Sequence, residues 1–402
     1  MLLQFAVENY LSIKDEVMLN MAASSDKMLH ENLLEYGNRK SYLRTVGIYG
    51  ANASGKSNLI KALMTAVMMV RKSNNRMINE TLNEIVPFKF DETAVEKPSV
   101  FKFIFVVDGV KYYYAFSATR KAIIDECLYW YKTAKPTTVF ERTNTHDYKF
   151  PQSDKSVMEG LKEKNTDNKL FLATATNWNY EKTRKAFLWF MEEIDIVLDY
   201  QGLHNSGTLE AFRNDEANHL KNFTLQLMQE ADLNIDTITV DITDEASTEY
   251  RIKTGHAITC HNKTKKIELL LEEESLGTQT LFFLAPILKN VFDKGETLCI
   301  DEIEMHLHPL LVEFIIGLFH KSAINEKGAQ LIFTTHDMHL MSLDLMRRDQ
   351  LYFVDKNKNT GATEIYSLDE FSVRKNENIR KAYLAGRYGG VPNCRRIQPP
   401  VQ

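Results

Sequence analysis

The feature that most constrains this 402-residue chain is a glycine-rich octapeptide at residues 50–57, Gly-Ala-Asn-Ala-Ser-Gly-Lys-Ser. It fits the pattern G-x-x-x-x-G-K-[ST] at every fixed position. A β-rich run, 44–49, precedes it and a helical pattern, 56–70, follows. Glycines let backbone N–H groups surround a polyphosphate, and the helix N-terminus adds partial positive charge. The flanking elements favour this interpretation over a chance glycine turn.

The composition of the chain excludes several classes of protein. The 49 basic and 54 acidic residues give a net charge of −5, so any contact with nucleic acid must come from a local patch. No segment approaches the roughly 20 apolar residues that cross a bilayer, and residues 1–10 lack the basic start of a signal peptide. The four cysteines are far apart, which disfavours zinc and disulfide frameworks. We therefore expect a reduced, soluble, cytoplasmic protein.

The arrangement of β-rich and helical patterns predicts an α/β fold. In the last third, expected strands alternate with expected helices, which is typical of a mainly parallel sheet flanked by helices. The strands are 297–300, 330–333 and 350–354, and the helices are 278–292 and 310–320. An early strand is expected at 1–7. Earlier, Asp108-Gly109 between two β-rich runs predicts a hairpin in an antiparallel lobe over 100–118. A helical segment, 209–230, and a meander of short strands, 237–242, 249–253 and 266–271, lie between them.

Two carboxylates follow the expected strand 297–300. Asp301 stands where a Mg²⁺-binding aspartate belongs, and Ser57 of the glycine-rich loop would offer its hydroxyl to the same ion. Glu302 would orient and deprotonate an attacking water. The alternative is that both carboxylates simply lie in solvent at the end of a strand. The phosphate-binding loop in the same chain favours the metal and catalytic roles over this alternative.

Two further elements suit phosphate contacts. His336 follows another apolar strand and could donate a hydrogen bond to a γ-phosphate. Ser275 can cap the helix that follows it, and Gly277 leaves N–H groups free, which makes a second anion site. An ordinary loop histidine and an ordinary N-cap are the alternatives. Because Ser275 is distant from Ser57 in sequence, the two need not face the same phosphate within one subunit.

These elements, in this order, resemble the ABC-type ATPase heads of the SMC, RecF and OLD class. Residues 50–57 look like Walker A, 275–279 like the signature motif in the S-x-G-T form, and 300–302 like Walker B with its glutamate. Residues 306–309 look like the D-loop, His336 like the switch histidine, and 8–13 like the opening strand. The stretches 301–309, 334–337 and 379–390 are similar to stand-alone bacterial AAA-type ATP-binding proteins of abortive-infection and other anti-phage systems, which commonly accompany a toxic nuclease subunit.

The resemblance implies a P-loop ATPase that closes a homodimer or higher oligomer around ATP and Mg²⁺. It implies that Glu302 and His336 are catalytic and that Ser57 and Asp301 hold the metal. The implied ATP contacts are Gly50, Asn52, Ala53, Ser54, Gly55, Lys56, Ser57, Asn58, Ser275, Gly277 and Thr278. The expected function is regulation of a separate effector protein, a nuclease or toxin, in anti-phage defence. No association with a membrane is expected. The alternative is a RecF- or SMC-like DNA-repair or DNA-end ATPase that binds DNA or RNA.

We expect four segments. Residues 1–170 form the first half of the head with the antiparallel lobe, 171–272 a helical insertion and strand meander, 273–373 the second half, and 374–402 a tail with seven basic residues and one acidic residue. The tail could contact nucleic acid or a partner protein. Too few residues follow His336 for a Toprim domain, which disfavours nuclease activity.

Three smaller features also have two interpretations. Asn177 is a candidate for the Q-loop position. The pair His306 and His308 is better explained by a dimer contact than by a metal site. The aromatic residues of the antiparallel lobe, around 112–116 and 130–131, are better explained by cross-strand packing than by stacking on bases.

Overall fold

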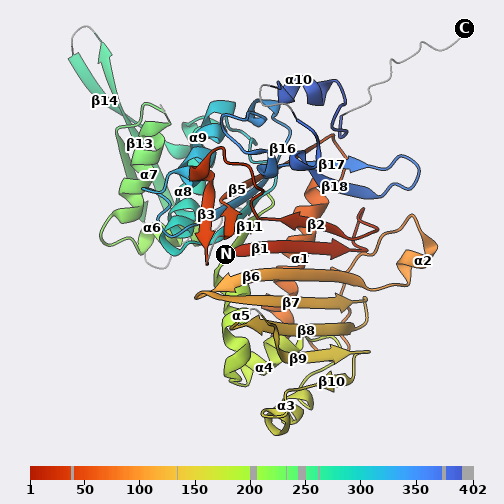
Figure 1. Ribbon diagram of the computed structural model, residues 1–402. Helices are drawn as coiled ribbons and strands as arrows, with labels where there is room; N and C mark the ends of the chain where they lie inside the picture. The colour runs from red at the N-terminus through yellow and green to blue at the C-terminus, as the bar shows by residue number, and fades with distance from the viewer. Residues whose placement is uncertain are drawn as a thin grey trace, which may run out of the picture.

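The computed structural model describes residues 1–37, 40–133, 135–199, 206–231, 233–242, 250–260, 263–373 and 377–391. Two large sheets dominate the molecule (Figure 1). The six-stranded sheet has the order β11-β15-β16-β5-β17-β18, and the seven-stranded sheet has the order β10-β9-β8-β7-β6-β1-β2. Helices pack on both faces of the six-stranded sheet, which confirms the predicted α/β class.

The six-stranded sheet is mainly parallel. Its strands are β5 (Thr45–Gly50), β11 (Ile194–Val197), β15 (Thr297–Ile300), β16 (Gln330–Thr335), β17 (Leu351–Lys356) and β18 (Thr363–Ser367). Every neighbouring pair is parallel except β17 and β18, which form an antiparallel hairpin. The parallel strands all end at one edge of the sheet, so the loops that follow them meet there.

The seven-stranded sheet forms the predicted antiparallel lobe. Its strands are β1 (Leu2–Glu8), β2 (Val17–Asn20), β6 (Ser99–Val107), β7 (Val110–Ala118), β8 (Ile123–Tyr131), β9 (Thr137–Thr143) and β10 (Asp147–Lys149). Val107 pairs with Val110 across the predicted turn, where Asp108 and Gly109 have φ of 47° and 73°. Tyr112 is buried and stacks on Phe105, so the cross-strand packing predicted for the aromatic residues is confirmed at this position.

Helices cover the parallel sheet on both faces. The helix α1 (Lys56–Lys72), with α4 (Phe171–Asn177) and α5 (Glu181–Glu192), lies between the parallel sheet and the antiparallel lobe and shares their apolar core. On the opposite face, α7 (His219–Glu230), α8 (Leu276–Lys294) and α9 (Pro309–His320) form a second core with the strands. The expected helices 56–70, 278–292 and 310–320 are therefore confirmed.

The middle of the chain differs from the expected division. The segment 171–272 is not one insertion, because β11 within it pairs with β15 in the parallel sheet and α4 and α5 pack beneath the lobe. The expected helix 209–230 is two helices, α6 (Ser206–Arg213) and α7, separated at Asn218 with φ of 56°. The expected meander is a three-stranded sheet of β12 (Thr237–Ile242), β13 (Tyr250–Cys260) and β14 (Lys263–Leu270).

The remaining elements are short. The strands β3 (Leu33–Tyr36) and β4 (Lys40–Leu43) form a hairpin, while α2 (Glu92–Val95), α3 (Lys155–Lys162) and α10 (Ile379–Leu384) lie at the periphery (Figure 1). In the described parts of the chain, no helix is both long enough and apolar enough to span a membrane. The end of the basic tail, residues 392–402, falls outside the described residues.

Candidate functional site

The loop between β5 and α1 follows the backbone path that its glycines allow. A Cβ added at Gly50 would lie 2.4 Å from the carbonyl oxygen of Val354, so the backbone of β17 leaves no room for a side chain. Gly55 has φ of 113°, and a Cβ there would lie 2.2 Å from the Thr363 hydroxyl oxygen. These two positions require glycine because of the close approach of neighbouring strands and the left-handed backbone.

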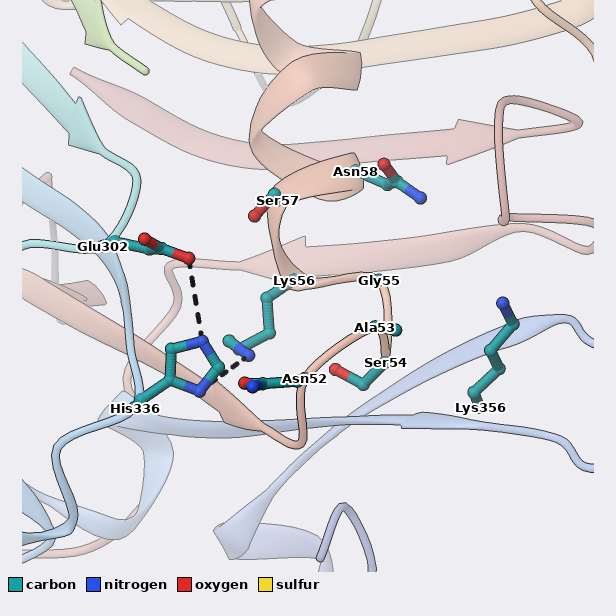
Figure 2. A pocket seen from close by; sticks show the side chains of 10 residues that line it. All are labelled: Asn52, Ala53, Ser54, Gly55, Lys56, Ser57, Asn58, Glu302, His336 and Lys356. Carbon is teal, nitrogen blue, oxygen red and sulfur yellow. Dashed lines mark hydrogen bonds and ion pairs between the residues drawn. The ribbon is translucent and has the colours of Figure 1, made fainter. Parts of the chain in front are cut away.

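An open cavity of about 690 Å³ lies over this loop (Figure 2). Residues from the ends of four parallel strands line it: residues 52–58 after β5, Glu302 after β15, His336 after β16, and Lys356 at the end of β17. The structure thus brings together the expected loop residues, Glu302 and His336 in one cavity. Gly50 lies beneath the loop, and its carbonyl oxygen accepts a hydrogen bond from Lys56.

The ammonium group of Lys56 is fixed beneath the cavity. Its Nζ donates to the carbonyl oxygens of Gly50 at 2.8 Å and Ala51 at 3.1 Å, and it lies 3.4 Å from Nδ1 of His336. Burial lowers the pKa of Lys56, although the nearby carboxylates of Glu302, Glu304 and Asp301 oppose this shift. A buried ammonium group under a glycine-rich loop fits a polyphosphate ligand.

Thr334 positions the two carboxylates that follow β15. Its hydroxyl donates to Oδ1 of Asp301 at 2.5 Å and accepts from the N–H of Glu302 at 2.8 Å. Asp301 is only 8% exposed and is not among the described residues that line the cavity. Glu302 has φ of 52°, and its side chain reaches into the cavity, where Oε1 lies 3.7 Å from Nε2 of His336 (Figure 2). One acid is therefore enclosed and the other is open to water.

Ser275, Gly277 and Thr278 lie elsewhere. Ser275 caps α8, with its hydroxyl oxygen 3.1 Å from the Thr278 N–H that donates to it. A Cβ at Gly277 would lie 2.8 Å from the carbonyl oxygen of His306, so this helix start packs against the loop that resembles the D-loop. None of these three residues is among the described residues that line the cavity. Asn177, at the exposed end of α4, does not line it either.

A comparison with known protein families identifies the family to which this chain belongs. A family model described as "AAA domain, putative AbiEii toxin, Type IV TA system" matches residues 46–342, which include the glycine-rich loop, both carboxylates and His336. The chain belongs to this AAA-domain family. A search of curated proteins finds no match.

Several solved structures are similar at low identity. The SMC head domain from Thermotoga maritima is 13% identical with a TM-score of 0.42, covering 91% of this chain and 98% of that one. The SmcHead bound to the C-winged helix domain of ScpA is 12% identical with a TM-score of 0.44, covering 91% and 97%. CbiO1 from Clostridium perfringens, part of the ABC transporter complex cbiONQ, is 14% identical with a TM-score of 0.33, covering 94% of each. The family assignment rests on the family model.

Within this AAA-domain chain, sequence reasoning did not find Lys356, which lines the cavity, nor Thr363 and Ser12, which contact the loop. The Thr363 hydroxyl donates to the carbonyl oxygen of Ser54 at 2.9 Å, and the Ser12 hydroxyl accepts from the Asn58 side-chain amide at 2.7 Å. The two hydroxyls also contact each other at 2.7 Å. The hydroxyls of Ser12 and Thr363 thus contact the glycine-rich loop and the start of α1 without lining the cavity. Only the position of Ser12 in the opening motif 8–13 carried a signal.

Sequence reasoning also did not assign a role to two acids next to His336, namely Glu304 and Asp337. Oε1 of Glu304 accepts a hydrogen bond from the N–H of His336. The other carboxylate oxygen of Glu304 is buried without a partner among the described residues, as are Oδ2 of Asp337 and the hydroxyl of Ser54. Unpaired buried oxygens are costly, and here they gather at the end of the sheet that carries the cavity.

Proposed function

We propose that this protein binds and hydrolyses Mg-ATP, closes a dimer around it, and thereby regulates a separate effector protein in bacterial anti-phage defence. The observation that carries the proposal is the convergence of Lys56, Glu302 and His336 on one glycine-lined cavity, with the Ser275 helix start outside it. Family membership supports nucleotide binding, typically with Mg²⁺.

Each cavity residue has a role that its position supports. Lys56 neutralises charge on the β and γ phosphates, and the N–H groups of residues 52–58 bind phosphate oxygens. Ser57 and Asp301 would hold Mg²⁺, which neutralises phosphate charge when bound. His336 would bind the γ-phosphate, and Glu302, which is open to water, takes a proton from the attacking water.

The surface around Ser275 supports dimer closure. Leu276, next to Ser275, is 60% exposed, and Leu310, next to the D-loop-like segment, is 67% exposed. Large exposed apolar side chains beside a helix N-terminus suit a surface that a second copy covers. In the closed dimer, Ser275, Gly277 and Thr278 of one chain would complete the ATP site of the other.

The basic tail favours an effector regulator over a DNA clamp. Tyr383 and Tyr388 are buried and stack on Phe353 of β17, so the described part of the tail packs on its own head. Arg387 pairs with Glu377, which reduces the positive charge offered to a nucleic acid. The family description refers to a type IV toxin–antitoxin system, which supports a role in bacterial defence.

Dimer closure can be tested with Ser275→Arg. We expect this variant to bind ATP as a monomer but to lose ATP-driven dimerisation, because the bulky cation occupies the helix start. Size-exclusion chromatography with light scattering, with and without ATP, measures this. The matched control is Ser153→Arg on the exposed loop before α3. Equal dimerisation of both variants would contradict the proposed interface.

The effector can be sought with Glu302→Gln, which should retain ATP. Purification of this variant with ATP from its native host, followed by identification of what remains bound, separates the two functions. A bound protein supports the regulator. Bound DNA or RNA without a protein contradicts it and favours the DNA-repair alternative.

A further inference from the structure

A second cavity, of about 480 Å³, lies beside the glycine-rich loop. It is formed where the loop after β1, the segment before α2 and the β17–β18 turn meet. Its most unusual feature is Phe90, whose large apolar side chain is 72% exposed. The lining residues are Lys14, Phe88, Phe90, Asp91, Asn359, Thr360 and Gly361.

The Phe90 ring is exposed but firmly held. It contacts the buried Phe88 ring edge-to-face, with 5.7 Å between the ring centroids. Gly361 has φ of 69°, and a Cβ there would lie 2.8 Å from Cδ2 of Phe90, so this glycine allows the ring to pack against the turn. An anchored aromatic ring that remains open to solvent loses little conformational entropy when a flat ligand stacks on it.

Short contacts connect this cavity to the glycine-rich loop. Thr363 donates its N–H to the carbonyl oxygen of Ser12 and its hydroxyl to that of Ser54. Gly361 and Lys14 lie two residues from Thr363 and Ser12, respectively. Lys356 lines the first cavity, and its Nζ lies 5.8 Å from the centroid of the Phe90 ring. Lys356 therefore links the first cavity to the Phe90 ring of the second.

The direction of a bound nucleotide follows from the placement of charge. Glu302 and His336 lie on one side of the loop, and Lys356 lies on the other (Figure 2). In the proposed function, the γ-phosphate faces Glu302 and His336. The nucleoside must then extend toward Lys356 and Phe90.

We propose that the base of the nucleoside triphosphate stacks on Phe90, between Lys14 and Lys356. This rests on the proposed function and assigns its base-binding site. Asp91 forms an ion pair with Lys14 at 2.8 Å, so its charge is balanced at the cavity wall. Stacking tolerates every base because each has a π-face, so Phe90 supplies affinity without selecting between adenine and guanine.

The test compares two ligands, Mg-ATP and Mg-tripolyphosphate, by isothermal titration with the full chain. Tripolyphosphate has the phosphates but no base. We expect Phe90→Ala to weaken ATP binding by about tenfold and to leave tripolyphosphate binding unchanged. Phe90→Trp should restore ATP binding. Trp178→Ala, which removes an exposed aromatic ring on the far end of α4, is the matched control and should alter neither Kd.

Two results would overturn the inference. If Phe90→Ala binds ATP as tightly as the wild type, while Lys56→Ala loses both ligands, nucleotide binding stands and the base lies elsewhere. If Phe90→Ala weakens both ligands equally, the residue supports the loop and does not bind the base. A wild-type protein that binds neither ligand would instead refute the proposed function itself.

Discussion

The amino and carboxyl ends of the strands in the six-stranded sheet differ in how their buried polar groups are hydrogen-bonded. At the amino ends, Gln350 donates from Nε2 to the carbonyl oxygen and the hydroxyl of Thr45, at 2.9 and 2.6 Å. Its Oε1 accepts from the N–H of Arg347 and the side-chain amide of Asn32. At the carboxyl ends, buried oxygens of Ser54, Glu304 and Asp337 have no partner among the described residues.

This difference indicates that the amino ends of the strands contribute mainly to stability and the carboxyl ends mainly to ligand binding. Gln330, at the start of β16, accepts from the N–H of Leu2 and donates to the carbonyl oxygen of Leu43, so it ties the antiparallel lobe to the parallel sheet. Burial lowers the pKa of His320 to about 4, which keeps this partner of Thr45 neutral. Most polar groups that we describe at the amino ends are hydrogen-bonded, although Oδ1 of Asn32 has no partner among the described residues, whereas three oxygens at the carboxyl ends stay available to a ligand. We expect substitutions at one end to change activity and at the other to change folding.

The largest effect is expected at Glu302. Glu302→Gln keeps the size of the side chain but removes the base, so ATP turnover should fall by about 10²- to 10⁴-fold while ATP binding and thermal stability stay unchanged. Phosphate release in single turnover measures this. The control is Glu326→Gln, an exposed substitution away from the cavity. Turnover close to that of the wild type would show that Glu302 is not the base.

The next effect concerns binding alone. Lys56→Ala removes the buried cation, so we expect ATP affinity to fall by about 10²- to 10³-fold, since each hydrogen bond to a charged group contributes about 1.5 to 3 kcal/mol. Stability should change little, because the loss of the hydrogen bonds to Gly50 and Ala51 is offset by relief of the desolvation cost that lowers the pKa of Lys56. Lys56→Arg should fail to restore affinity, because the planar guanidinium cannot enter this loop as an ammonium does. Unchanged affinity in Lys56→Ala would remove the main support for the phosphate site.

Sequence reasoning succeeded where chemistry fixes residue type and spacing together. The loop 50–57, the carboxylates after β15 and the turn at Asp108-Gly109 were predictable because each depends on neighbours in the chain. The contact between Ser12 and Thr363 was not, because it joins hydroxyls 351 residues apart and leaves no local pattern. The placement of β11 was missed for the same reason: its partner, β15, is distant in sequence, and four residues carry little periodicity.

At the amino ends we expect a loss of stability without a loss of function. Gln350→Leu leaves Thr45, Arg347 and Asn32 with unpaired buried groups, so the free energy of unfolding should fall by about 3 kcal/mol, at about 1 kcal/mol or more for each group. Urea denaturation measures this, and ATP affinity below the transition should match the wild type. Gln152→Leu, on an exposed turn, is the control. A large loss of ATP affinity in the folded variant would break the separation between the two ends.

The smallest effect concerns a buried acid at the amino ends, Glu296, which directly precedes β15. Its carboxylate accepts from the Asn290 amide at 2.8 Å through Oε2, and its buried Oε1 lies 3.4 Å from Nζ of Lys294. Burial, with the negative charge of Asp195, raises the pKa of Glu296 to about 7, although the ammonium group of Lys294 opposes this shift.

Between about pH 4.5 and 7 the folded chain therefore binds more protons at Glu296 than the unfolded chain does, so the stability that this residue contributes falls as the pH rises. Gln is neutral throughout and can still accept from Asn290. Glu296→Gln should thus match the wild type near pH 4.5 and exceed its free energy of unfolding by about 1 to 2 kcal/mol at pH 8. Urea denaturation at pH 5, 6.5 and 8 measures the difference between the two proteins, in which the opposite titration of His320 cancels. A difference that stays constant with pH would show that Glu296 is ionised in the folded protein, and that the amino ends hold a charge as readily as the carboxyl ends do.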